Sequence, residues 1–418
     1  MENDEKFALG KKASGKRLQF CTFKLECLLE TAIAVNECSN VDEILKTFTN
    51  ILHNQLEIGK ILLFNYNERW STIIISGVSK NVADEIKLPD DLIYYKQITH
   101  LTNALNKHLT VFDVLIPVIS NNQPIAYLLI GDVDEEREGI SPTIKHLHFI
   151  QTLANIIITA IENRRLFNEN LFQEGIKKEL DYARRMQMML IPSYSELPNN
   201  EHIKAASYYL PHFEVGGDYY DMIQLSEYEY GFCVADVSGK GISAALLMSN
   251  FQANIRALFT SNSSLDDIVQ KSNQRVIKNT NGEKFITLFI GKYDFRTKIL
   301  SYINAGHNYP ILYNKSDGTV KHLQKGCTGI GMLDIIPNLT IGETTVTDGS
   351  RLVLYTDGIS ELENEQEDYY GTDKMESEVV QTHSIDIVVD NLVEDMIKYK
   401  GTCPYPDDIT LLILEFRT

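Results

Sequence analysis

The chain has 418 residues, a formal charge of -18 and 44% hydrophobic residues. Its length exceeds that of one compact domain and fits two, each with an ample core. The acidic balance opposes binding to nucleic acid or to an anionic membrane surface, because both need a basic face. The start of the chain has no apolar signal core, and no run reaches the roughly 18 apolar residues that span a bilayer. We therefore expect a cytoplasmic protein without membrane insertion.

The first half predicts an α/β domain behind a polar N-terminal segment, residues 1–23. Apolar side chains recur at helical spacing over residues 25–56, with a break near Ser39. Strand-like runs follow at residues 61–66, 70–76, 111–118 and 125–131, with a hairpin turn at residues 121–124, and a helix from Pro142 closes the domain.

None of the six cysteines has CxxC or zinc-ligand spacing, so we expect free buried thiols: Cys21, Cys27, Cys38, Cys233, Cys327 and Cys403.

A nearly continuous helix is predicted over residues 143–190, which contain no proline. Its apolar positions form an imperfect heptad-like stripe. The first half of this helix can pack on its own domain, whereas the second half is polar and needs a partner to justify its length. We expect a parallel coiled coil in a homodimer, and the alternative is a helix that packs only within its own chain.

Acidic residues occupy strand ends throughout the second half. The apolar run at residues 230–235 predicts a strand that ends at Asp236, followed by a glycine turn and a helix over residues 242–259. A lone acid in such a place is usually a cap or a turn residue. Three further sites share the pattern, and they contain Asp218 in EVGGDYYD, Asp357 in LYTDGISE, and Asp407 and Asp408 in PDDITLLIL.

These carboxylates meet only if their strands lie side by side, and unpaired carboxylates at close range repel one another. A hard divalent cation resolves that repulsion, because Mg²⁺ and Mn²⁺ prefer carboxylate, carbonyl and water oxygens. The pattern therefore predicts a hydrolytic metal site. The turn after Asp236 is no P-loop, since Lys240 is followed by Gly241 and not by Ser or Thr.

The motifs ARRMQMMLIP, EVGGDYYD, ADVSGKGISAAL, NAGHNYP, LYTDGISE and PDDITLLIL follow one another over residues 180–418. In this order they resemble the type 2C metal-dependent protein serine/threonine phosphatases, and most closely their bacterial stage II sporulation E-like branch. The region of residues 24–163 resembles a GAF-type sensor domain whose ligand the residues do not select. The resemblance implies an α+β chain with a GAF-like α/β domain at residues 24–163, a helical linker at residues 164–190 and an αββα sandwich at residues 191–418.

The resemblance also implies site roles. Asp236 would bridge two cations, Mn²⁺ or Mg²⁺, with the carbonyl of Val237 as a further ligand. Asp218 would bind one cation, and Asp357 with Asp407 would complete the second site. Asp408 stands where other members have a non-ligand Asn, so Asp407 is the favoured member of the pair, with Asp408 kept as a candidate. A metal-bridging water would attack phosphoserine or phosphothreonine. The general acid stays unassigned, because Ser238 stands where many members have a His.

Family enzymes use a helix before the first strand to control the second metal. Here that helix would be residues 179–190, with Met186, Met189 and Leu190 able to pack against the phosphatase core. The implied substrate is a phosphorylated regulatory protein, typically an anti-sigma-factor antagonist in a partner-switching pathway. One alternative is a catalytically degenerate scaffold. A more distant one is a GAF-linked nucleotide cyclase, because the stretch GGDYY is similar to a cyclase signature.

Overall fold

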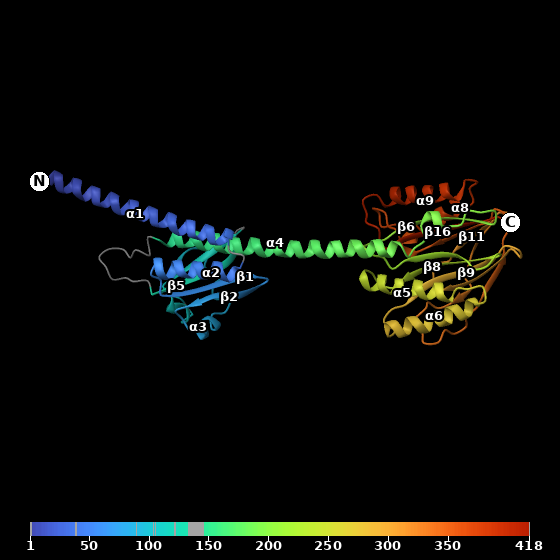
Figure 1. Cartoon of the computed structure of the whole chain (residues 1–418), viewed down its shortest axis with the longest axis horizontal. Coiled ribbons are helices and arrows are strands. Elements are labelled where there is room, and N and C mark those ends of the chain that lie inside the picture. The colour runs from blue at the N-terminus through green and yellow to red at the C-terminus, as the bar shows by residue number, and fades with distance from the viewer. Residues whose placement is uncertain are drawn as a thin grey trace. The chain divides into compact units, whose positions relative to one another are not determined.

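The computed structural model describes residues 2–37, 40–88, 90–102, 104, 106–120, 123–132 and 146–417. These residues form two compact units that divide between Glu174 and Gly175 (Figure 1). Within the described ranges, no helix combines the length and the apolar character needed to cross a bilayer. The described cysteines are free thiols. Cys27 and Cys233 are buried as expected, whereas Cys21 is exposed.

The N-terminal unit is built on a five-stranded antiparallel sheet of order β2-β1-β5-β4-β3. Its strands are β1 (Lys60–Asn67), β2 (Arg69–Ser76), β3 (Thr99–His100), β4 (Val114–Ser120) and β5 (Gln123–Gly131). Its helical elements are α1 (Glu2–Glu37), α2 (Val41–Asn50), the π-helical turn η1 (Ile51–Gln55), α3 (Lys80–Asp84), the 3-10 turn η2 (Leu109–Val111) and the first part of α4 (Leu147–Met188). The four predicted strands are present. The predicted helix start at Pro142 and the hairpin residues 121 and 122 lie outside the described residues.

Both faces of this sheet are covered. Ile61 and Leu63 of β1 pack with α1, α2 and α4, while Leu62 and Phe64 pack on the other face against α3 and the following loops. Successive residues of a strand point to opposite faces, so a fully apolar run is buried on both sides. The break between α1 and α2 is stabilised by Asn40, whose side chain accepts a hydrogen bond from the backbone N–H of Asp42 at 3.1 Å.

The C-terminal unit is a sandwich of two sheets. The first has the order β13-β10-β9-β8-β7 with β14 paired to β10, and the second has the order β12-β11-β15-β16-β6. The first sheet contains β7 (Tyr219–Gln224), β8 (Glu229–Val237), β9 (Ile286–Asp294), β10 (Ile299–Ala305), β13 (Gly326–Cys327) and β14 (Gly342–Thr345). The second contains β6 (Ile203–Leu210), β11 (Ile311–Asn314), β12 (Thr319–His322), β15 (Arg351–Tyr355) and β16 (Ile409–Phe416). The helical elements are η4 (Tyr194–Glu196), α5 (Ile242–Leu258), α6 (Leu265–Thr280), α7 (Asp357–Ser360), α8 (Asp373–Val379) and α9 (Ile385–Lys400).

Helices cover the outer faces, which gives the unit four layers in the order α-β-β-α. Helices α5 and α6 lie on the first sheet, and α8 and α9 lie on the second (Figure 1). Strand β16 shows how the layers form: Leu412 and Leu414 enter the core between the sheets, while Leu411 and Ile413 pack under α9. The predicted αββα sandwich is confirmed for this unit.

The strand pairing brings the predicted acids to one end of the sandwich. Strands β15 and β16 are antiparallel with Tyr355 opposite Leu411, so the residues after β15 lie beside the residues before β16. In the other sheet, Tyr219 at the start of β7 lies opposite Ala235 near the end of β8. Asp218, Asp236, Asp357 and the pair at 407 and 408 therefore share one end of the unit.

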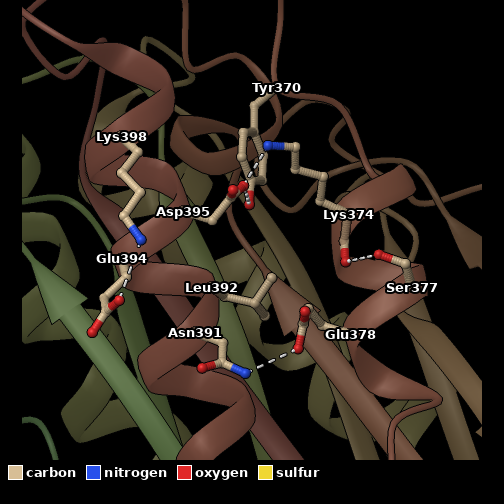
Figure 2. A pocket seen from close by; sticks show the side chains of 9 residues that line it. All are labelled: Tyr370, Lys374, Ser377, Glu378, Asn391, Leu392, Glu394, Asp395 and Lys398. Carbon is tan, nitrogen blue, oxygen red and sulfur yellow. Dashed lines mark hydrogen bonds and ion pairs between the residues drawn. The ribbon is translucent and has the colours of Figure 1, made fainter.

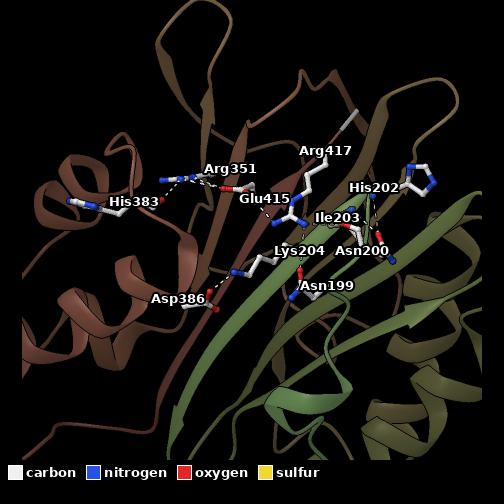
Figure 3. Close-up of polar contacts among 10 residues, drawn as sticks. All are labelled: Asn199, Asn200, His202, Ile203, Lys204, Arg351, His383, Asp386, Glu415 and Arg417. Atoms are coloured by element: carbon white, nitrogen blue, oxygen red, sulfur yellow. Dashed lines mark hydrogen bonds and ion pairs between the residues drawn. The ribbon is translucent and has the colours of Figure 1, made fainter.

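The opposite end is fastened by a polar network (Figure 3). The buried Arg351, at the start of β15, pairs with Glu415 at 3.2 Å and donates to the carbonyl oxygens of Val379, at the end of α8, and of Gln381 and His383, which follow it. Lys204 of β6 pairs with Asp386 in the first turn of α9. These contacts tie α8 and α9 to the sheet far from the acids, so they serve the fold.

Candidate functional site

Asp218 is the most deeply buried acid of the site, with 1% of its surface exposed. Its Oδ2 accepts hydrogen bonds from the hydroxyls of Thr356 at 2.7 Å and Thr410 at 2.5 Å. Both threonines are fully buried and belong to the second sheet region, whereas Asp218 precedes β7 of the first. The two hydroxyls hold one carboxylate oxygen and so set the direction of the other.

Asp408 binds the backbone of the loop that carries Asp218. Its carboxylate accepts hydrogen bonds from the N–H groups of His212 at 2.6 Å, Gly217 at 2.5 Å and Asp218 at 3.2 Å. A side chain at Gly216 would place its Cβ 2.5 Å from Asp408 Oδ2, so this approach requires glycine there. With three N–H donors on its oxygens, Asp408 is occupied as a loop anchor.

Asp407 faces outward beside it, with 37% of its side chain exposed. Its Oδ1 accepts the N–H of Asp408 at 2.8 Å, and its Oδ2 pairs with Lys240 Nζ at 2.8 Å. Lys240 Nζ also donates to the carbonyl of Pro406 at 2.5 Å. The geometry therefore favours Asp407 over Asp408 as a candidate cation ligand, because a lysine ammonium already stands at its outer oxygen.

Asp236 lies within β8 instead of after it, opposite Thr287 of β9, because the strand continues two residues beyond its predicted end. The carbonyl oxygen of the next residue, Val237, faces the loop before β7, where a Cβ on Gly217 would come within 3.0 Å of it. Asp357, predicted to form a turn, begins the one-turn helix α7. The absence of a side chain at Gly217 allows this loop to lie close to the Val237 carbonyl, next to Asp236.

The charges of these acids act on one another. Burial raises the pKa of Asp236 to about 7, and the charges of Asp357, Asp407 and Asp408 add to the rise. Burial, followed by the charges of Asp236 and Asp408, holds the pKa of Asp218 well above its ordinary value. Burial and the charge of Asp407 also raise the pKa of Asp357. A group of carboxylates that destabilise one another in this way fits the oxygen-rich donor set of a hard divalent cation.

The carboxylate oxygens of these acids do not yet point to one common position at which a cation could bind. Among the described residues, no group of three or more acidic, histidine or cysteine side chains is arranged to hold a metal ion. The hydrogen bonds explain why: one Asp218 oxygen is turned to two threonines, and both Asp407 oxygens are engaged. The residues fit a cation by chemistry and placement, and its binding requires small rearrangements of these side chains.

The end of α4 contacts the site through Gln187, which is 6% exposed. Its amide donates to the carbonyl of Gly216 at 2.8 Å and accepts the N–H of Gly216 at 3.0 Å. Met186 and Met189, expected to pack on the core, are instead 71% and 84% exposed, because the helix turns Gln187 inward. Leu190 is partly buried, and its carbonyl accepts a hydrogen bond from Gln252 at 3.5 Å.

His307 is buried beside Thr287, the residue of β9 that lies opposite Asp236. Its ring Nδ1 lies 2.8 Å from the hydroxyl of Thr287, and its backbone N–H donates to Asn304 Oδ1 at 2.8 Å. Burial lowers its pKa to about 4, with the Tyr355 backbone opposing the shift. A neutral, buried ring of this kind anchors the loop after β10.

A cavity of about 390 Å³ lies between α8 and α9 (Figure 2). Asp395 accepts there from Lys374 Nζ at 2.6 Å and from the Tyr370 hydroxyl at 2.9 Å. Lys374 pairs there with Asp395 and Lys398 with Glu394, Glu378 accepts a hydrogen bond from Asn391, and none of the site acids lines the cavity. The acidic site is therefore distinct from this cavity.

Residues 226–417 match the sequence profile of the family described as Stage II sporulation protein E (SpoIIE). The C-terminal unit is therefore similar to the SpoIIE family over most of its length. The family match gives no support to the nucleotide-cyclase alternative. Phosphoserine phosphatase RsbU of Bacillus subtilis is 26% identical over 245 residues, which cover 58% of this chain and 71% of RsbU. Protein IcfG of Synechocystis sp. (strain ATCC 27184 / PCC 6803 / Kazusa) is 25% identical over 271 residues, which cover 57% of this chain but only 42% of IcfG.

A solved structure confirms the fold of the C-terminal unit. The SiaA-PP2C domain of Pseudomonas aeruginosa superposes with a TM-score of 0.51 at 23% sequence identity. The match covers 59% of this chain and 98% of the SiaA domain. The type 2C phosphatase fold predicted from the motifs is thus confirmed for the C-terminal unit.

Four residues of the site were not found from the sequence: Thr356, Thr410, Gln187 and Lys240. A signal existed for the threonines, since each is a hydroxyl residue inside or beside an otherwise apolar strand run. Gln187 gave no such signal, because its partner Gly216 is 29 residues away.

Proposed function

We propose that this chain is a metal-dependent protein serine/threonine phosphatase. The observation that carries the proposal is the gathering of Asp218, Asp236, Asp357 and Asp407 at one end of a type 2C sandwich, where burial and mutual charge raise the pKa of Asp236 to about 7. A scaffold used only for binding gains nothing from acids that repel one another, which argues against the degenerate alternative.

The residues have separate roles in this proposal. Asp236 and the Val237 carbonyl, with Asp218 on one side and Asp357 with Asp407 on the other, would hold two Mn²⁺ or Mg²⁺ ions. Bound cations would supply an activated water for attack at phosphorus and would neutralise charge that develops there. Thr356 and Thr410 orient Asp218, and Asp408 holds the loop that carries Asp218 in place. All three residues therefore support the site.

The relatives support a phosphoprotein substrate. RsbU and RsbP of Bacillus subtilis are both named phosphoserine phosphatases, and RsbP is 26% identical over 273 residues that cover 66% of its length. We propose a small phosphorylated regulator, of the anti-sigma-factor antagonist class, as the substrate. The net charge of -18 on this chain opposes binding to nucleic acid, which agrees with a protein substrate.

The N-terminal unit is proposed as a GAF-like sensor domain, supported by its five-stranded antiparallel sheet with α1, α2 and α4 on one face and α3 with loops on the other. A homodimer is proposed through α4. In the first unit this helix exposes several large apolar side chains to solvent: Leu166, Phe167, Leu171 and Phe172. A second copy of the helix would cover them, and an apolar stripe of this size is seldom left exposed in a monomer.

The test is phosphate release from a phosphoserine peptide by the full chain with Mn²⁺ or Mg²⁺, followed by addition of EDTA. We expect turnover that EDTA abolishes and that Asp236→Asn eliminates without unfolding the protein. Asp267→Asn is the matched control, because Asp267 is an exposed acid on α6 that pairs only with its helical neighbour Lys271. Absence of turnover with either metal, or near-native activity of Asp236→Asn, would overturn the proposal.

A further inference from the structure

Lys240 is placed by a rigid turn between β8 and α5. Ser238 donates its N–H to the Phe285 carbonyl and accepts the Phe285 N–H on its hydroxyl, both at 2.9 Å. Lys284 Nζ donates to the Ser238 carbonyl at 2.9 Å. The backbone on the N-terminal side of Lys240 is therefore held, while its side chain, 42% exposed, reaches Asp407 and the carbonyl of Pro406.

The charge balance of the site makes this position unusual. Five carboxyl groups gather there, and among the ion pairs of the described residues the one that reaches them joins Lys240 to Asp407 at 2.8 Å. Lys284, the other nearby lysine, is engaged with a backbone carbonyl. A phosphate monoester carries about two negative charges near neutral pH and needs positive charge to enter an acidic site.

The two contacts of Lys240 are of a kind that the side chain can exchange for others. Its ammonium rests on the Asp407 oxygen that faces outward and on one backbone carbonyl, and both contacts lie at a partly exposed surface. An ion pair of this exposure contributes little to stability and is readily exchanged. The flexible four-carbon stem of lysine allows the ammonium to move from one partner to another without a change in the backbone.

We propose that Lys240 binds the phosphoryl oxygens of the substrate. If Asp407 held a divalent cation, Lys240 would lose its partner there, and its ammonium would be available to the phosphate at the mouth of the site. The inference rests on the proposed phosphatase function and adds a substrate-binding residue to it. Lysine commonly recognises phosphate as a point charge, so no further partner is required.

The test compares Lys240→Met and Lys240→Arg with Lys271→Met in the full chain. Lys271 is a fitting control because it is a lysine of similar exposure, 51%, paired with an aspartate at 2.6 Å on α6. Mn²⁺ binding to the metal-free protein is followed by the electron paramagnetic resonance signal of free Mn²⁺. The binding of inorganic phosphate to the Mn²⁺-loaded protein is followed by calorimetry, and KM and kcat are measured with a phosphoserine peptide.

For Lys240→Met we expect the dissociation constant of phosphate and the KM of the peptide to rise roughly tenfold or more, the loss typical of a charged hydrogen bond. Lys240→Arg should restore most of this loss. Mn²⁺ binding by Lys240→Met should be as tight as in the wild type or tighter, because no ammonium competes for Asp407. Lys271→Met should change none of these values.

Two results would overturn the inference: an unchanged phosphate affinity in Lys240→Met, or a loss of Mn²⁺ binding as large as that of Asp407→Asn. The first would show that Lys240 does not meet the phosphate, and the second that it only builds the metal site. Should the wild type hydrolyse no phosphoester, the phosphatase proposal fails by itself. The Mn²⁺ and phosphate titrations still decide the role of Lys240 in that case.

Discussion

Gln187 at the end of α4 is hydrogen-bonded to Gly216, in the loop that carries Asp218, and we expect this contact to affect cation binding. Gln187→Ala removes two hydrogen bonds, of 2.8 and 3.0 Å, and leaves the N–H and the C=O of the buried Gly216 without partners. Each buried backbone group left unsatisfied costs about 1–3 kcal/mol. Water that enters the space left by the side chain offsets part of this cost, so we expect a loss of about 2–4 kcal/mol in the free energy of unfolding.

The same substitution should weaken cation binding, because Asp218 is only two residues from Gly216. If about 2 kcal/mol of the loss falls on the position of the Asp218 loop, the Mn²⁺ concentration for half-maximal activity rises roughly 30-fold. The assay is a Mn²⁺ titration of phosphatase activity, beside a urea unfolding curve of the metal-free protein. Gln187→Glu should be at least as harmful, since its carboxylate cannot donate to the Gly216 carbonyl.

Met189→Ala is the matched control, because Met189 lies two residues away and is 84% exposed. We expect it to leave both the Mn²⁺ dependence and the unfolding curve close to those of the wild type. The reasoning is refuted if Gln187→Ala keeps the Mn²⁺ dependence of the wild type, or if Met189→Ala shifts it by as much. Either result would mean that the site is controlled through the methionines or through access of the substrate.

Three further outcomes follow from the contacts. Asp408→Asn should lower the free energy of unfolding, because the Asp408 carboxylate accepts hydrogen bonds from three backbone N–H groups. Asp407→Asn should instead weaken Mn²⁺ binding with little effect on stability. Urea unfolding and Mn²⁺ titration of the two variants separate these effects, and equal behaviour of the variants would contradict the assignment. His307 has a folded-state pKa of about 4, below its ordinary value of 6.5, so the unfolded chain takes up the proton first as the pH falls. The free energy of unfolding should therefore decrease by about 2 kcal/mol between pH 7 and pH 5. Urea midpoints of His307→Gln, which should show a smaller decrease over the same range, check the cause. Phe172→Glu, at a side chain that is 70% exposed, should convert the proposed dimer to monomer in light scattering, and a wild-type monomer at micromolar concentration would remove the coiled-coil argument.

Much of the fold follows from local pattern. The runs at residues 230–235, 351–355 and after Asp408 are strands because β-branched and aromatic residues alternate or cluster between turn residues, and the structure places β8, β15 and β16 there. The helix after Gly241 begins at Ile242 as predicted. The positions of Asp218, Asp236, Asp357 and Asp407 at strand ends were also predicted, because a short segment of sequence suffices to show that an acid borders an apolar run; their role as cation ligands stays a prediction.

The tertiary structure alone decided which oxygen of each acid is available. Asp407 and Asp408 are neighbours with the same side chain, yet Asp408 is held by N–H groups about 190 residues distant in the chain while Asp407 meets Lys240. Likewise, the helical pattern near residue 187 predicted inward-facing methionines, and the pairing with Gly216 turned the polar Gln187 inward instead. Local sequence encodes the tendency to form a strand or a helix, whereas a hydrogen-bond partner depends on which strands pair and in which register, and that is settled only when the two sheets have packed together.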